Sequence, residues 1–196
     1  MSEGLKQFSF DFETLDRNVE YFVTARLMDG VPSVWTKDLE YVTWRHLVGD
    51  RLGVDPAEVQ LVGSARLGYS LNPGKNFKKF DSESDLDVAI INSDIFEQSW
   101  TELRRLFEEG NFHGMKGRLR KLVFEECIGL DIVLPHLSFG QAWSKAREDL
   151  IASLGSEFTS LDINYRIYRN HKSLRAYQLK SVKAAEARAV GDGVLT

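Results

Sequence analysis

The sequence predicts a small α/β domain of the α+β kind, with helices flanking a mixed β-sheet. Short apolar runs of strand length alternate with longer stretches in which apolar residues recur at helical spacing. Glycine or proline stands at several of the boundaries, and no internal repeat interrupts the order. With 196 residues, 43% of them hydrophobic, the chain is long enough to bury a core, and we expect one domain, 1–196.

Composition narrows the class of protein. The single cysteine, Cys127, excludes an internal disulfide and lies among apolar residues, as small core residues do. The first residues do not resemble a leader, and no apolar run approaches the ~20 residues that span a bilayer. We therefore expect a cytoplasmic protein without a membrane partner.

The net charge of −4 disfavours bulk binding to nucleic acid, and the four histidines lack metal-ligand spacing.

The first half of the chain predicts a helix, a strand and a glycine turn, in that order. The segment before the turn at Gly30 reads as irregular or strand-like. After the capping residue Thr36, apolar residues at helical spacing predict a helix over 36–52. A glycine and a proline then separate this helix from a short apolar strand, 59–62.

The second half alternates strands and helices. The pattern predicts, in chain order, a strand at 85–91, a helix at 93–109, a strand at 128–135, a helix at 138–155, a strand at 161–169 and a helix at 170–190. The strand at 161–169 alternates, which places Ile163, Tyr165 and Ile167 on one face.

Two aspartates open the strand at 85–91. Residues two apart on a strand point to the same side, so Asp85 and Asp87 project together. Two carboxylates at that distance repel each other unless a cation lies between them. Mg²⁺ prefers oxygen ligands and is commonly held by one or two carboxylates together with substrate phosphates. The pair therefore predicts a site for Mg²⁺, or Mn²⁺, that serves phosphate chemistry.

A glycine–serine turn ends the preceding strand. Gly63 lets the backbone approach a ligand, and Ser64 offers a hydroxyl beside backbone N–H groups. Arg66, two residues further on, is expected to neutralise a leaving pyrophosphate. Together these residues are expected to hold phosphate groups while a hydroxyl attacks phosphorus in line.

The order of these motifs resembles the DNA polymerase β-like nucleotidyltransferase superfamily: a strand, then Gly63 and Ser64, then a second strand that opens with “SDLDVAI”. The stretch is most similar to minimal bacterial nucleotidyltransferases of toxin–antitoxin pairs and, more loosely, to the cyclic-oligonucleotide synthases of anti-phage defence. The resemblance covers residues 36–135, and a strand and helix follow at 160–190. It implies a nucleotidyltransferase-like fold, a nucleoside triphosphate (NTP) as substrate, and Mg²⁺.

One departure from the family pattern is a longer loop between the two motifs. The insert “LNPGKNFKKF”, 71–80, brings Lys75, Lys78 and Lys79 beside the expected nucleotide site. We expect Lys75 and Lys79 to bind the triphosphate or an anionic acceptor, although a solvated loop explains them more simply.

The third carboxylate of the family is the other uncertain match. Asp131 in “GLDIVLP” is the choice that the resemblance implies, as metal ligand and activator of the acceptor hydroxyl, and Asp162 in “LDINYR” is the alternative. If neither residue joins Asp85 and Asp87, metal binding is weakened and the domain is expected to be inactive.

The resemblance implies an enzyme that transfers a nucleoside monophosphate from an NTP to an acceptor and releases pyrophosphate. Only about 60 residues follow “LDIVLP”, so a protein, small-molecule or nucleotide acceptor is favoured over a long template. The alternative is an inactive relative that binds a nucleotide or a partner protein, as an antitoxin or sensor. RNA 3′-end modification through basic stretches such as “KGRLRK”, 116–121, is the least favoured function.

Aromatic and basic residues also alternate on the strand at 161–169. Tyr165, Arg166, Tyr168 and Arg169 could stack a base and hold its phosphates. Packing of one face and solvation of the other explains the same pattern more simply.

Overall fold

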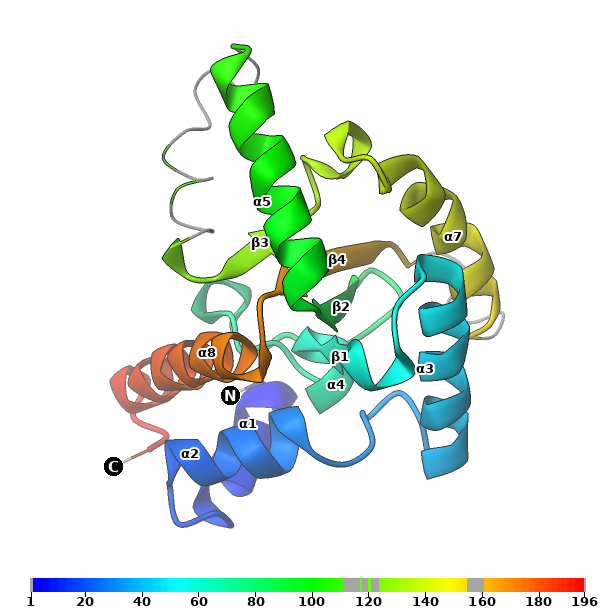
Figure 1. Ribbon diagram of the computed structural model, residues 1–196. Coiled ribbons are helices and arrows are strands. Elements are labelled where there is room, and N and C mark those ends of the chain that lie inside the picture. Colours follow the sequence, from blue (N-terminus) through cyan, green and yellow to red (C-terminus); the bar gives the residue numbers. More distant parts are fainter. Residues whose placement is uncertain (1, 111–116, 118–119, 121–123, 155–160, 196) are drawn as a thin grey trace.

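The structure is a computed structural model and describes residues 2–110, 117, 120, 124–154 and 161–195 (Figure 1). The helices are α1 (Glu3–Glu13), α2 (Val19–Phe22), the π-helical segment η1 (Val23–Met28), α3 (Asp38–Leu52), η2 (Pro56–Glu58), α4 (Gly63–Leu67), η3 (Pro73–Lys75), α5 (Ser93–Glu108), η4 (Leu134–His136), α7 (Gly140–Ala152) and α8 (His171–Gly191). The strands are β1 (Val59–Val62), β2 (Leu86–Ile91), β3 (Cys127–Gly129) and β4 (Ile163–Tyr168).

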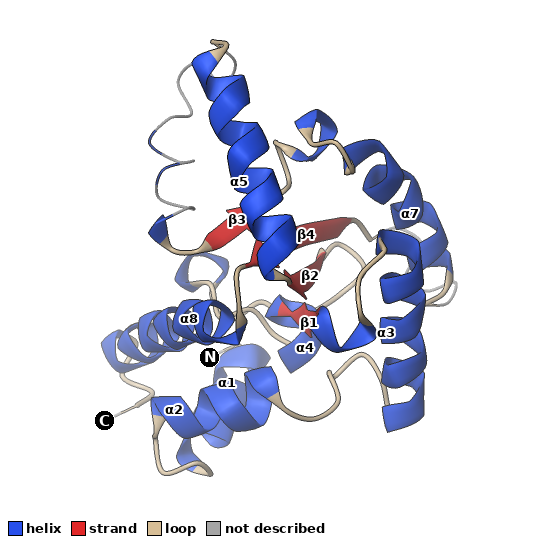
Figure 2. Cartoon of the chain, viewed as in Figure 1, coloured by secondary structure: helices blue, strands red, loops and turns tan. Residues whose placement is uncertain are grey.

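The four strands form one mixed sheet with the order β1-β2-β4-β3. Strand β1 runs antiparallel to β2, β2 runs parallel to β4, and β3 runs antiparallel to β4. Figure 2 shows this small sheet at the centre of the molecule, surrounded by helices. The expectation of a mixed sheet flanked by helices is therefore confirmed.

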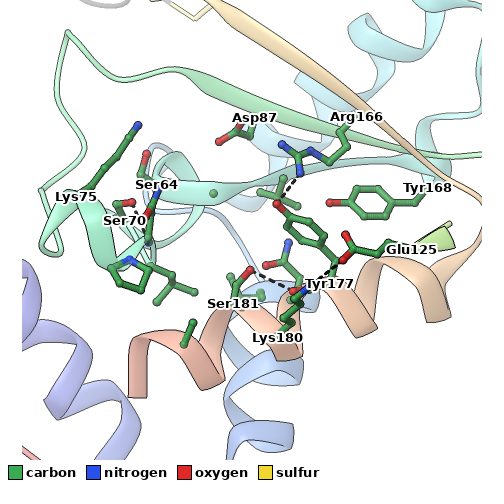
Figure 3. A pocket seen from close by; sticks show the side chains of 18 residues that line it. Ser64, Ser70, Lys75, Asp87, Glu125, Arg166, Tyr168, Tyr177, Lys180 and Ser181 are labelled. Atoms are coloured by element: carbon green, nitrogen blue, oxygen red, sulfur yellow. Dashed lines mark hydrogen bonds and ion pairs between the residues drawn. The ribbon is translucent and has the colours of Figure 1, made fainter. Parts of the chain in front are cut away.

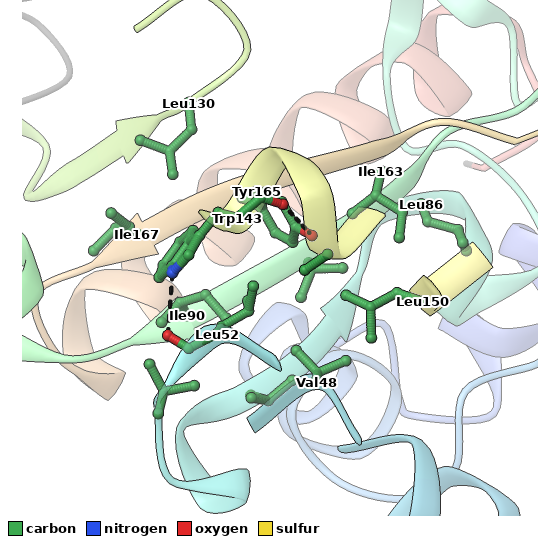
Figure 4. Close-up of a cluster of buried hydrophobic side chains, with 14 of the residues drawn as sticks. Val48, Leu52, Leu86, Ile90, Leu130, Trp143, Leu150, Ile163, Tyr165 and Ile167 are labelled. Carbon is green, nitrogen blue, oxygen red and sulfur yellow. Dashed lines mark hydrogen bonds between the residues drawn. The ribbon is translucent and has the colours of Figure 1, made fainter. Parts of the chain in front are cut away.

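The main core covers the sheet face on which Val88, Ile90 and Tyr165 lie. Helices α3, α5 and α7 supply many of the other apolar side chains of this core. Figure 4 shows Trp143 of α7 against Tyr165, and its indole Nε1 donates a hydrogen bond to the Leu52 carbonyl at 3.1 Å. The alternation that the sequence predicts for β4 thus faces this core.

The opposite face of the sheet is covered by helix α8. A small apolar cluster there joins Ala89 and Ile91 of β2, Tyr168 of β4 and Leu174 of α8 with Cys127, which is buried as predicted. Figure 1 shows α8 on one side of the sheet and α3 and α7 on the other.

A separate apolar cluster lies beyond α8 and joins the two ends of the chain. Its buried side chains come from α1, α2, η1, the C-terminal half of α8 and the loop after α4. Phe8 lies at its centre, with ring centroids 5.1 Å from Phe77 and 5.4 Å from Phe12. This cluster anchors the basic insert 71–80, because Phe77 belongs to that insert.

Two sequence predictions are wrong in detail. The segment before Gly30 is largely helical, since Leu5, Phe8 and Phe12 recur at helical spacing and Ser2 caps α1 by accepting a hydrogen bond from the Leu5 N–H. The strand expected at 128–135 ends at Gly129 and continues as turns and η4.

The remaining expected elements are present with ends shifted by a few residues. Most of the basic stretch 116–121 lies outside the described residues. Within the described ranges, no helix has both the length and the apolar composition needed to cross a membrane.

Candidate functional site

A cavity of about 570 Å³ lies between the edge of the sheet, the loop after α4 and helix α8 (Figure 3). Four of the residues predicted for the phosphate and metal sites line it, Gly63, Ser64, Lys75 and Asp87, and so do Arg166 and Tyr168 of β4. The far wall is made by α8, which no motif had indicated. The cavity is therefore the place where the predicted motifs come together.

The Gly-Ser turn touches the aspartate strand directly. Strand β1 ends at Val62, which is paired in register with Asp87 on β2. Gly63 follows with a φ of 69°, and a Cβ at this position would overlap the Asp87 carboxylate. Only glycine combines this backbone conformation with this close approach. The two halves of the predicted motif are thus in contact.

The Asp87 carboxylate is partly buried and lies near both positive and negative charges. Burial raises its pKa, the positive charges of Arg166 and Lys75 lower it, and the negative charge of Asp85 raises it again. The outcome is a pKa above the ordinary carboxyl value, because burial outweighs the attraction to the cations. A further cation beside Asp87 would favour its charged form.

Asp85 and Asp87 are neighbouring carboxylates at the start of β2. Asp85 immediately precedes β2 and is partly buried. Among residues 2–110, 117, 120, 124–154 and 161–195, no three His, Cys, Asp or Glu side chains gather closely enough to hold a metal ion. A cation at this place would have at most these two carboxylates as acidic ligands among the described residues, and water or phosphate oxygens would complete its shell.

Asp131 lies at the same end of the sheet but not beside Asp87. The Leu130 N–H donates to the Tyr165 carbonyl at 3.0 Å, so the chain still follows β4, and the exposed Asp131 comes next in a turn. Strand β4 separates the two aspartates, since Asn164 of β4 is the residue in register with Asp87. Asp131 does not line the cavity.

Asp162, the alternative third carboxylate, is drawn to the other face of the sheet. Its Oδ1 lies 3.7 Å from Arg147 Nη1 on α7, and it accepts a hydrogen bond from the Ile163 N–H at 2.8 Å. The cavity is bounded by α8 and not by α7, so Asp162 does not line it. The Asp162 backbone does lie beside the start of β2, since the Leu86 N–H donates to its carbonyl at 2.8 Å. Within the described residues, however, neither candidate carboxylate forms a three-acid group with Asp85 and Asp87.

Arg66 does not face the cavity, contrary to the sequence expectation. It is buried, 4% exposed, and its guanidinium donates to the carbonyls of Arg26, Asp29 and Gly30. Residues two apart on a helix point in nearly opposite directions, so Ser64 and Arg66 cannot serve one ligand from α4. Arg66 instead holds the segment after η1 against α4.

The three lysines of the insert also differ in their surroundings. Lys75 lines the cavity and makes no ion pair with another described residue. Lys78 pairs with Asp81 at 3.1 Å. Lys79, which was expected at the nucleotide site, pairs with Glu3 of α1 and lies outside the cavity wall.

Arg166 is the cavity residue whose position the sequence left open. Its Nη1 donates to the Tyr177 hydroxyl at 2.6 Å, and its guanidinium lies 4.9 Å from the centre of the Tyr177 ring (Figure 3). Burial alone would lower the pKa of Arg166, but Tyr168, Tyr177 and Asp87 outweigh burial and raise it. Arg166 is thus a charged group at the base of the cavity.

A signal for Arg166 was present in the alternation of β4. The residues between the core-facing Ile163, Tyr165 and Ile167 must face the other side, where the cavity lies.

No family model, curated protein or solved structure matches this chain.

Proposed function

We propose that this protein is a nucleotidyltransferase that binds an NTP in the cavity beside Asp87. With Mg²⁺ or Mn²⁺ it transfers a nucleoside monophosphate to an acceptor and releases pyrophosphate. The observation that carries the proposal is the contact between Gly63 and the Asp87 carboxylate, which joins a phosphate-binding turn and an acidic strand end in one cavity wall.

We assign a role in this reaction to the residues around the cavity. The Ser64 hydroxyl and the Lys75 ammonium bind the β- and γ-phosphates. Asp87, which lines the cavity, holds the metal together with Asp85, which lies outside the cavity lining but close enough for its charge to act on Asp87. When bound, the metal neutralises charge on the phosphates. Arg166 adds a fixed positive charge at the base of the cavity.

The chemical step is an in-line substitution at phosphorus. The acceptor oxygen forms a bond to the α-phosphorus, the bond from that phosphorus to the bridging oxygen breaks, and pyrophosphate leaves with the electron pair. The acceptor proton goes to solvent, because Asp131, to which the resemblance assigns this step, does not line the cavity. A protein, a small molecule or a nucleotide is the proposed acceptor, and bacterial toxin–antitoxin control or anti-phage defence is the proposed setting.

The test is label transfer from α-labelled NTPs with Mg²⁺, with the protein alone and with candidate acceptors. Asp85→Asn is expected to lower product formation by at least about 100-fold, because the charge that holds the metal is halved. Asp162→Asn is the matched control, since Asp162 lies at the same end of the sheet but pairs with Arg147. Unchanged labelling by the Asp85→Asn variant would show that the assignment is wrong.

The second candidate function is nucleotide binding without turnover. It is supported by Asn164, which occupies the position in register with Asp87 where a neighbouring carboxylate would complete the site. A pure binding module should retain NTP affinity in the Asp85→Asn variant while the wild-type protein forms no pyrophosphate. An enzyme should lose pyrophosphate formation in that variant.

A further inference from the structure

Helix α8 carries a buried glutamine on its apolar side. Leu174, Gln178 and Val182 follow one another at a spacing of four, and all three are buried. Gln178 is only 4% exposed. A carboxamide in such a stripe costs free energy unless its donor and acceptor are satisfied.

The Gln178 carboxamide has no partner within the described part of the chain. It forms no hydrogen bond there, and it is not among the unpartnered polar atoms that are sealed from solvent in the described residues. Gln178 lines the cavity, so its amide is directed into that space. The cavity therefore contains a hydrogen-bond donor and a hydrogen-bond acceptor that no described residue satisfies.

A second buried glutamine shows the contrast. Gln60 on β1 is 8% exposed, and its Nε2 donates to the carbonyls of Leu27 and Met28, each at 2.8 Å. Gln60 therefore has a structural role that explains its burial. Gln178 has no such explanation within the described residues.

The surroundings of Gln178 suit a flat ring. The same cavity is lined by Leu27 and Val62, which are apolar, and by Tyr177, whose ring is fixed by the hydrogen bond to Arg166. Apolar and aromatic walls with a few placed polar groups are typical of sites that hold a planar heterocycle and fix its orientation.

We infer that Gln178 recognises the edge of the nucleobase of the bound NTP. Its carbonyl oxygen accepts from a ring or exocyclic N–H of the base, and its NH₂ donates to the neighbouring acceptor. The inference rests on the proposed function, because it assigns the phosphate end of the ligand to Ser64 and Lys75. It makes Gln178 the residue that determines which base is preferred.

The test compares the affinities of the four common NTPs and of inorganic tripolyphosphate, measured by calorimetry with Mg²⁺. The wild-type protein is expected to prefer one base by at least about fivefold, as a pair of hydrogen bonds to a base edge allows. Gln178→Leu keeps the volume but removes the amide, and it is expected to remove this preference. Its affinity for tripolyphosphate should equal that of the wild-type protein.

Thermal unfolding of the ligand-free protein gives a second measurement. Gln178→Leu should change Tm by less than about 2 °C, because the amide has no partner among the described residues and is accessible from the cavity. Gln60→Leu is the matched control and should lower Tm, because it leaves two carbonyls without their donor.

The outcomes separate the two proposals. If Gln178→Leu keeps the base preference, or lowers Tm as Gln60→Leu does, the inference is overturned and the proposed function stands. If the wild-type protein binds neither NTP nor tripolyphosphate, the proposed function fails and the inference fails with it. NTP binding without any base preference also overturns the inference alone.

Discussion

At the residue scale, the candidate site depends on a single contact between Gly63 and Asp87. The glycine has a φ of 69° and no room for a side chain, since the carboxylate occupies the space where a Cβ would lie. A substitution here therefore has two costs, backbone strain and displacement of the acidic group.

Gly63→Ala is expected to lower the free energy of unfolding by about 1–3 kcal/mol and to weaken NTP binding. The reason is that alanine disfavours the positive φ and its methyl group overlaps Asp87. Urea unfolding and nucleotide titration measure the two effects.

Gly53→Ala is the control that isolates strain. Gly53 ends α3 with a φ of 71°, and no atom lies within 4 Å of its Cβ position. This variant should lose stability but keep nucleotide affinity. If the two variants bind nucleotide equally well, the contact with Asp87 does not shape the site.

The sequence predicted which residues lie near the candidate site in most cases, but it did not predict which way each side chain points. Gly63, Ser64 and Asp87 follow from the motif order, because β1 and β2 pair next to each other. Arg66 was misplaced, since these residues belong to a five-residue helix, in which positions two apart point in nearly opposite directions. Gln178 escaped notice because one polar residue in a helical stripe gives no signal until its surroundings are known.

At the element scale, helix α5 is fastened to the segment before α7 by a carboxylate. Glu102 accepts hydrogen bonds from the Ser138 N–H at 2.8 Å and from the Ser138 hydroxyl at 2.7 Å. Partial burial by itself would raise the pKa of Glu102, but these bonds outweigh it and lower the pKa. The charged form is therefore favoured in the folded protein.

This linkage predicts a pH dependence. The stability from Glu102 should be complete above the ordinary carboxyl pKa and lost as the pH falls through the lowered pKa of the folded protein. Glu102→Gln should cost less than about 1 kcal/mol at neutral pH, since the group is partly solvated, and the difference from wild type should vanish in acid.

The measurement is the urea midpoint as a function of pH. Glu108→Gln is the control, because Glu108 is exposed on the same helix. A Glu102→Gln variant whose deficit stays constant down to the acid range would contradict the linkage.

The elements themselves were predicted where periodicity and boundary residues agreed. Strands β1, β2 and β4 and helices α3, α5 and α8 are of this kind. Helix α1 was missed although Phe8 and Phe12 stand four residues apart, because its partners in α8 and in the insert are far away in the sequence. Strand β3 is shorter than predicted because the chain turns after Gly129.

At the scale of the whole molecule, two apolar cores share helix α8. One covers the sheet, and the other holds α1, α2 and the insert that carries Lys75 to the cavity. The cavity lies between these regions, so its shape depends on both.

Phe8→Ala is expected to lower the free energy of unfolding by about 3–5 kcal/mol, as for other fully buried aromatic residues. It should also weaken NTP binding, because Phe8 packs on Phe77 of the Lys75 insert. Phe10→Ala, a change to a side chain that is 62% exposed on the same helix, should alter stability by less than about 0.5 kcal/mol. Equal urea midpoints for the two variants would contradict this account.

The strand order has a consequence for how the chain folds. Strand β4 lies between β2 and β3, although it follows both of them in the chain. Until β4 leaves the ribosome, the facing edges of β2 and β3 have unpaired N–H and C=O groups that another chain can capture. Pairing of β2 with β4 closes a long loop that includes α5 and α7, so it is a slow step. Helix α8 follows directly, and the nascent chain therefore gains its cavity only when this last closure is complete.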